Sequence, residues 1–182
     1  ISMKKGEILT RVESPTDYPN YYIRNIKKRM APRQITFVQN PFTGMDKIHK
    51  EEIKYKRDDG LELSAVMYLP SGYDTRNPEK LPMLMWAYPE EFKDKSSAGQ
   101  ITNSPYEFIY PYYGSFIYWV NKGYVVLDDV SFPIVGEGEK EPNDSFREQL
   151  VANGKAAIDA VDALAFAGGC ALQPLPAASG GD

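Results

Sequence analysis

Residues 81–92, LPMLMWAYPEEF, form an almost continuous apolar run that stops at Tyr88-Pro89 and is followed by two carboxylates. Such a run, bounded by turn residues, predicts a strand that is buried on both faces in the middle of a parallel sheet. Glu90 and Glu91 are then expected just beyond the carboxyl end of this strand. Open α/β sheets place their ligand sites at that end, so this stretch organises the search for function.

A second strand is expected after a helix. Phe116, Ile117 and Val120 share one face of a predicted helix from Tyr113 to Lys122, and Gly123 is placed as its C-cap. Tyr124–Leu127 is a short apolar strand that ends at Asp128-Asp129. Strand, helix and strand in this spacing predict a crossover between parallel strands.

A second helix is expected to follow the acidic loop 133–142, with Asn143 or Asp144 as its N-cap. Gly154 in its middle indicates close packing on the sheet. Its predicted apolar face has helical spacing and comprises Phe146, Leu150, Val151, Ala157, Ile158, Val161 and Leu164.

Upstream of the apolar run, a hairpin is expected. Two alternating segments flank Asp58-Asp59-Gly60, and Asp-Gly is a strong turn signal between strands. Residues 1–48 hold three shorter segments, 7–12, 21–26 and 34–38, separated by prolines. They predict a small antiparallel sheet that is too small to form a domain by itself.

Composition narrows the possible functions. The 182 residues carry a net charge of −4, which argues against a general nucleic-acid binder. No apolar run approaches the about 20 residues that cross a bilayer, so no membrane partner is expected. A single cysteine, Cys170, excludes a disulfide within the chain, and the composition leaves the cellular compartment open.

Several motifs agree with one family, in order. Asp59-Gly60-Leu61, Tyr68-Leu69-Pro70 and the strand that runs into Tyr88-Pro89 resemble the amino-terminal half of a prolyl oligopeptidase-type α/β-hydrolase domain. Within that family, WAYPEEFKDK, AGQITNSPYEF and PIVGEGEKEPNDSFREQLVANGKAAIDAV are similar to the glutamyl endopeptidase branch. The similarity runs from about His49 to Leu164, and residues 1–48 resemble the end of the family's β-propeller.

The resemblance implies three regions: 1–48 as the end of a β-propeller, 49–166 as a partial α/β-hydrolase domain, and 167–182 as an irregular tail. It also implies a serine peptidase that cleaves peptide substrates by acyl-enzyme chemistry, without a metal or an organic cofactor. The family's nucleophile lies on a Gly-x-Ser-x-Gly turn after the second helix. In its place stands AGGCALQPLPAASGGD, and the later Asp and His are absent. We therefore expect a truncation or a reading-frame shift near Ala167, and an inactive chain.

Tyr88 is the one site residue that the resemblance carries over, as an oxyanion-hole donor. A tyrosine at an interface with a satisfied hydroxyl is the alternative. A Cys170–His49 pair is disfavoured, because the sequence predicts no strand before Cys170 to hold it. No metal site is expected, since the acidic residues between 137 and 144 lack calcium-loop spacing.

Two other functions stay open. An ester or amide hydrolase can share this fold, because fold does not fix substrate. A chain without catalysis could instead associate with itself through a sheet edge that is left open at Leu127.

Overall fold

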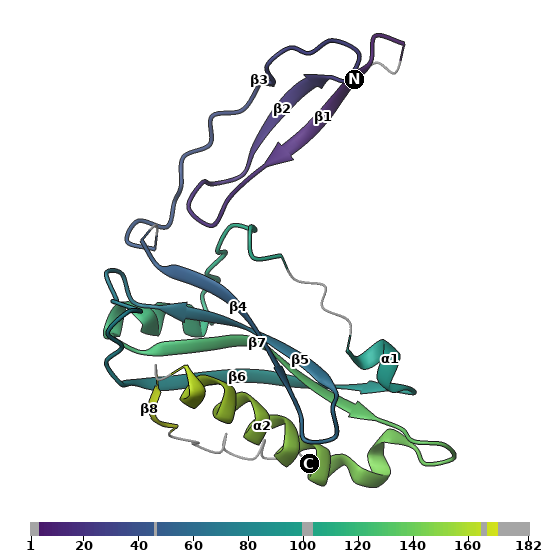
Figure 1. Ribbon diagram of the computed structural model, residues 1–182. Coiled ribbons are helices and arrows are strands. Elements are labelled where there is room, and N and C mark those ends of the chain that lie inside the picture. The colour runs from purple at the N-terminus through teal and green to yellow at the C-terminus, as the bar shows by residue number, and fades with distance from the viewer. Residues whose placement is uncertain (1–3, 46, 100–103, 165–166, 171–182) are drawn as a thin grey trace, which may run out of the picture.

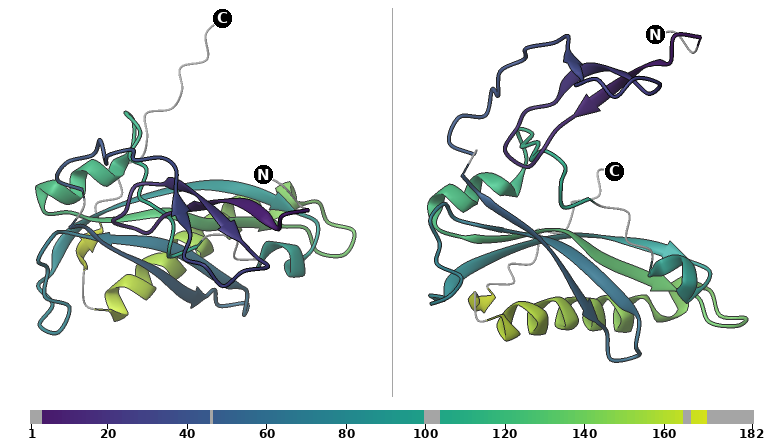
Figure 2. Two further views of the ribbon diagram at one scale, coloured as in Figure 1. Left: turned by 90° about the horizontal axis from the view of Figure 1, so that it is seen from above. Right: turned by 45° about the horizontal axis from the view of Figure 1, so that its top comes forward.

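The computed structural model describes residues 4–45, 47–99 and 104–164, and the strand backbone of 167–170. These residues form a three-stranded sheet, β1-β2-β3, and a five-stranded sheet in the order β4-β5-β7-β6-β8. The small sheet and the long helix α2 lie on opposite sides of the large sheet (Figures 1 and 2). The chain is therefore of the α/β type, as predicted.

The small sheet is antiparallel and comprises β1 (Glu7–Val12), β2 (Asn20–Asn25) and β3 (Arg33–Gln34). The predicted third strand, 34–38, is wrong in extent because the Asn20 side chain takes over its pairing. The Asn20 amide oxygen accepts hydrogen bonds from the Val38 N–H at 2.8 Å and from the Thr36 hydroxyl at 2.9 Å.

The predicted hairpin is confirmed as β4 (His49–Lys56) and β5 (Glu62–Leu69), which pair antiparallel. The turn closes with a hydrogen bond from the Gly60 N–H to the Arg57 carbonyl at 2.8 Å. Gly60 has φ +83°, the left-handed conformation that glycine adopts without steric cost.

The three parallel strands are β6 (Leu81–Phe92), β7 (Val125–Val135) and β8 (Ala167–Cys170). The predicted parallel crossover between the first two is confirmed. The expected position of β6 between parallel strands is also confirmed, because β7 and β8 flank it. Its expected burial on both faces is wrong, since only Met83 of β6 is fully buried. The short β8 pairs only with the first residues of β6, whereas β7 has a neighbour on each side.

The expected edge at Leu127 is also wrong, because β7 lies between β5 and β6. In the described part of the chain, the edge strands of the large sheet are β4 and β8. The helix predicted for 113–122 is a shorter 3-10 helix, η1 (Phe116–Lys122). The Ser115 hydroxyl caps its start, and Gly123, at φ +85°, ends it as predicted.

The second helix is confirmed as α2 (Phe146–Ala163), which follows the 3-10 turn η2 (Pro142–Ser145). The predicted caps are wrong: Ser145 is the N-cap of α2, and Asp144 accepts a hydrogen bond from the Glu141 N–H within η2. A short helix, α1 (Lys95–Ala98), follows β6.

The buried face of α2 is formed by Asn153, Ala156, Ala157 and Val161. Val151, predicted to be buried, is 71% exposed. The helix instead faces the sheet with Asn153 and the small residues Ala156 and Ala157. Gly154 does pack on the sheet, since a Cβ there would lie 3.7 Å from the Phe132 ring.

Three apolar clusters pack on the large sheet, and the two largest hold α2 and η1. One packs Ala157 and Val161 of α2 against the sheet, and the other packs Ile117 and Val120 of η1 against it. Leu127 belongs to the first cluster and is fully buried. Among the described residues, no helix is long and apolar enough to span a membrane.

Candidate functional site

Tyr88 lies inside β6 rather than at its end. The strand continues through Pro89, Glu90 and Glu91 to Phe92, because β7 supplies a parallel partner for each of these residues. A proline is tolerated there, since the described residues give this part of β6 a neighbour on one side only. The prediction that the strand stops at Tyr88 is therefore wrong, although the residue stays near the carboxyl half of the strand.

The surroundings of Tyr88 are open. Its side chain is 69% exposed, and its hydroxyl has no hydrogen-bond partner among the described residues. Tyr88 is in register with Ser131 of β7, whose hydroxyl lies 3.3 Å from the hydroxyl of buried Ser64 on β5. Tyr88, Ser131 and Ser64 thus lie on three neighbouring strands, β6, β7 and β5.

A β-bulge lies beside this strip. Met85 is in register with Leu127, whereas Ala87 is in register with Val130, so β7 holds one extra residue. Asp129 accommodates it at φ +46°, an unusual conformation for a residue other than glycine. Bulges are enriched next to active sites because they turn side chains to new directions.

Asp128 and Asp129 were expected at the end of a strand, and they lie in the middle of β7 instead. Burial raises the pKa of the Asp128 carboxyl, and one of its oxygens accepts a hydrogen bond from the Asp129 N–H at 3.0 Å. That bond satisfies part of a half-buried carboxylate and holds the bulge.

β8 corrects a further expectation. Ala167–Cys170 is a strand parallel to β6, with Cys170 in register with Met83. The predicted irregular tail from Ala167 is wrong for these four residues. Gly168 and Gly169 have low strand propensity, so the sequence did not predict a strand here. The strand forms through backbone pairing with β6. Residues 171–182 lie outside the described part of the chain.

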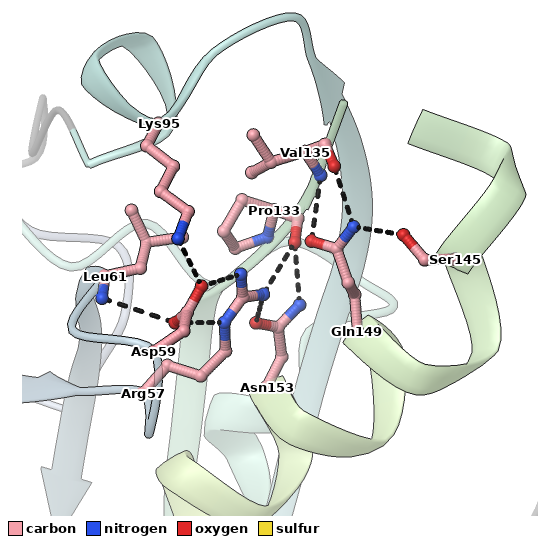
Figure 3. A network of polar contacts seen from close by, with 9 residues as sticks. All are labelled: Arg57, Asp59, Leu61, Lys95, Pro133, Val135, Ser145, Gln149 and Asn153. Atoms are coloured by element: carbon pink, nitrogen blue, oxygen red, sulfur yellow. Dashed lines mark hydrogen bonds and ion pairs between the residues drawn. The ribbon is translucent and has the colours of Figure 1, made fainter. Parts of the chain in front are cut away.

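A second polar region surrounds the carboxyl end of β7 (Figure 3). The buried Arg57 guanidinium donates to both carboxylate oxygens of Asp59, each at 2.9 Å. It also donates to the Asn153 amide oxygen at 2.9 Å and to the Pro133 carbonyl at 3.4 Å. Arg57 thereby joins the hairpin turn, α2 and β7.

Two more contacts complete this network. Lys95 Nζ lies 3.0 Å from Asp59, and the Gln149 side chain hydrogen-bonds to both the N–H and the carbonyl of Val135. An open cavity of about 570 Å³ lies beside these residues. The principal polar groups are already paired with one another, so the network serves to hold the carboxyl end of β7 rather than to bind a ligand.

Sequence reasoning missed Arg57, Gln149 and Asn153. Asn153 did carry a signal, because a polar residue within the apolar spacing of Leu150 and Ala157 indicates a buried hydrogen-bonding group. Arg57 carried none, since a basic residue before a turn is ordinary at a surface.

Asp59→Asn is expected to flatten the fall of stability in acid. Hydrogen bonds from Arg57, aided by Lys95, hold the pKa of the Asp59 carboxyl well below its usual range. Its stabilising effect is therefore complete above its unfolded pKa of about 4 and is lost as the pH falls through the folded value. Urea unfolding between about pH 5 and pH 2 should show a shallower decline in the variant. Parallel curves for both proteins would contradict this expectation.

The other candidates, His49 and Cys170, form no site with Tyr88 among the described residues. His49 is on the edge strand β4, with Nε2 at 3.3 Å from a Glu51 oxygen, and both side chains are about half exposed. The Cys170 side chain lies outside the described part of the chain. Within the described residues, no three His, Cys, Asp or Glu side chains gather closely enough to hold a metal ion.

The chain is similar in sequence to known proteins. No family model matches the chain. Over 163 residues, 88% of its length, it is 41% identical to a probable chloroplastic glutamyl endopeptidase of Oryza sativa subsp. japonica. A protein of the same name from Arabidopsis thaliana is 40% identical over 161 residues. Over most of its length the chain is therefore a homologue of these two probable glutamyl endopeptidases. The resemblance seen in the sequence is thereby confirmed.

The chain spans 17% of the length of each of these relatives. Solved structures agree with the fold. Oligopeptidase B from Trypanosoma brucei matches 89% of this chain and 21% of its own length, with a TM-score of 0.50 and 13% identity. The AtxE2 isopeptidase matches 90% and 24%, with a TM-score of 0.54 and 16% identity.

Proposed function

We propose that this chain is part of a serine peptidase that hydrolyses peptide bonds after glutamate through an acyl-enzyme. The observation that carries the proposal is the identity of about 40% to two probable glutamyl endopeptidases over 88% of the chain. Residues 1–48 are assigned to the end of a β-propeller, and residues from 49 onward to the first part of an α/β-hydrolase domain. The small antiparallel sheet and the mixed sheet with parallel β7, β6 and β8 support that division.

In the intact peptidase, the nucleophile is assigned to a turn after the strand beside β6, the position that β8 takes in this chain. In an α/β-hydrolase, the serine sits on a sharp turn after a strand at the top of the sheet. β8 is parallel to β6, the strand that carries Tyr88. The 182 residues contain no Gly-x-Ser-x-Gly, and their single histidine is on β4. We therefore assign no peptidase activity to these residues alone, and no metal or organic cofactor to the reaction.

Tyr88 is assigned to the oxyanion hole of that peptidase. Its exposed hydroxyl, free of partners among the described residues, is available to a ligand oxygen. A donor directed at the developing negative charge stabilises the transition state more than the substrate.

The proposal is tested on a longer product of the same DNA, one that includes a serine turn and the later acid and histidine. A fluorophosphonate probe is expected to label that product and not the 182-residue chain. The product should also cleave a peptide after glutamate faster than the matched glutamine peptide. Turnover of acyl esters without cleavage of either peptide would instead favour an esterase on the same fold.

Self-association of the 182-residue chain is a separate expectation, now assigned to the edge strand β8. The other edge, β4, is protected by its charged residues, whereas 167–170 carry none. Light scattering should show a mass that rises with concentration, and Gly169→Lys should reduce that rise. Gly99→Lys, which adds the same charge beyond α1, is the control. A monomer at every concentration would contradict the expectation.

A further inference from the structure

Residues 107–110, here called the strap, lie in the connection between β6 and η1 and contact both sheets. Successive residues of the strap face different partners. Glu107 and Ile109 are held by the large sheet, whereas Phe108 and Tyr110 are held by the small sheet. Glu107 and Phe108 make these hydrogen bonds with backbone groups, whereas Ile109 and Tyr110 make their contacts with side chains.

The small sheet contacts the strap through residues around the end of β1. The Phe108 N–H donates to a Glu13 carboxylate oxygen at 3.1 Å, and Arg11 Nη2 donates to the Tyr110 hydroxyl at 3.0 Å. The Tyr18 ring meets the Phe108 ring edge-on, with their centroids 5.2 Å apart. Phe108 is 5% exposed, and its ring centroid also lies 6.3 Å from that of Phe42, which packs against a cluster of the large sheet.

The large sheet contacts the strap at the other two positions, Glu107 and Ile109. Ile109 is 2% exposed and packs in the cluster that contains Val66 of β5 and Val120 of η1. Lys50 Nζ on β4 donates to the Glu107 carbonyl at 3.1 Å. Burial lowers the pKa of Lys50, and nearby carboxylates, Glu13 among them, oppose that shift. The Lys50 ammonium therefore acts on both the strap and the small sheet's carboxylate.

We propose that the strap is a two-sided coupling element that makes the order of each sheet depend on the other. If the contacts of the small sheet with Phe108 and Tyr110 are lost, these residues become mobile. Ile109 lies between them in sequence, so its packing against η1 is then weakened. Loosening the large-sheet grip acts in the reverse direction. Coupling between two sites is reciprocal in free energy, so both directions must appear together.

Amide hydrogen exchange of the 182-residue chain, followed by mass spectrometry, tests this coupling. Glu13→Ala is expected to speed exchange about 2- to 10-fold in η1, the range that one net hydrogen bond supplies. Lys50→Met is expected to speed exchange by a similar factor in β1 and β2. The matched controls are Glu7→Ala on β1 and Lys56→Met on β4, which remove equal charges away from the strap.

Two results overturn the proposal: each variant changes exchange only in its own sheet, or the controls change exchange as much as the variants do. Tyr110→Phe removes one hydroxyl and leaves the ring packing intact. If Glu13→Ala does not give the wild-type circular dichroism spectrum, Tyr110→Phe replaces it in the test. Tyr110→Phe is expected to speed exchange in η1 in the same way.

Discussion

Tyr88→Phe is expected to lower kcat/KM for peptide cleavage about 10²- to 10³-fold in a chain that includes a complete catalytic triad, the loss found when one oxyanion donor is removed. The substitution deletes a single hydroxyl and keeps the aromatic ring. Because the hydroxyl would bind the transition state and not the substrate, KM should change little and kcat should carry the loss.

The control for Tyr88 is Tyr113→Phe. Tyr113 is fully exposed, so removing its hydroxyl should leave kcat and KM unchanged. Steady-state kinetics with a glutamyl peptide measures both variants. A Tyr88→Phe enzyme with wild-type kcat would show that another group donates to the oxyanion, and Tyr88 would then be an ordinary interfacial tyrosine.

Arg57→Met is expected to lower the free energy of unfolding by about 3 kcal/mol, because it removes a buried charge that joins three elements. Methionine replaces the stem of the side chain, so the loss comes mainly from the guanidinium. The fully buried Asn153 amide oxygen then has no donor in the network. Asp59 keeps Lys95 at 3.0 Å, which limits the loss.

Arg76→Met is the matched control for Arg57. The Arg76 side chain is 92% exposed, and its Nε lies 3.3 Å from an Asp74 oxygen. Exposed pairs of this kind contribute little, so the variant should unfold within about 0.5 kcal/mol of the wild type. Urea unfolding measures both. Equal losses for the two variants would mean that the Arg57 network does not hold the carboxyl end of β7.

Much of the fold was predictable because local signals and tertiary structure agree. The Asp58-Asp59-Gly60 turn and the Gly123 cap depend on residues close together in sequence, and the parallel crossover follows from the order strand, helix, strand. The wrong predictions concern segments whose structure depends on a neighbouring strand. β6 continues past Tyr88-Pro89 only because β7 runs beside it, and β7 runs that far only because Asp129 accommodates a bulge.

The candidate site was less predictable than the fold. Tyr88 came from a family resemblance, since a tyrosine near a strand end has no distinctive spacing of its own. The Arg57 network joins residues 57, 95 and 153, and no local pattern connects positions so far apart. β8 was missed because Gly168 and Gly169 have low strand propensity, so backbone pairing with β6 decides their structure.

The most direct test of the peptidase assignment is to resequence the parent DNA across the codons for 164–182 and to translate the downstream sequence in all three forward frames. We expect one frame to give a strand followed by Gly-x-Ser-x-Gly, with an aspartate and a histidine further on. If no frame contains them, the kinship with glutamyl endopeptidases describes ancestry alone, and the peptidase assignment of this chain is wrong.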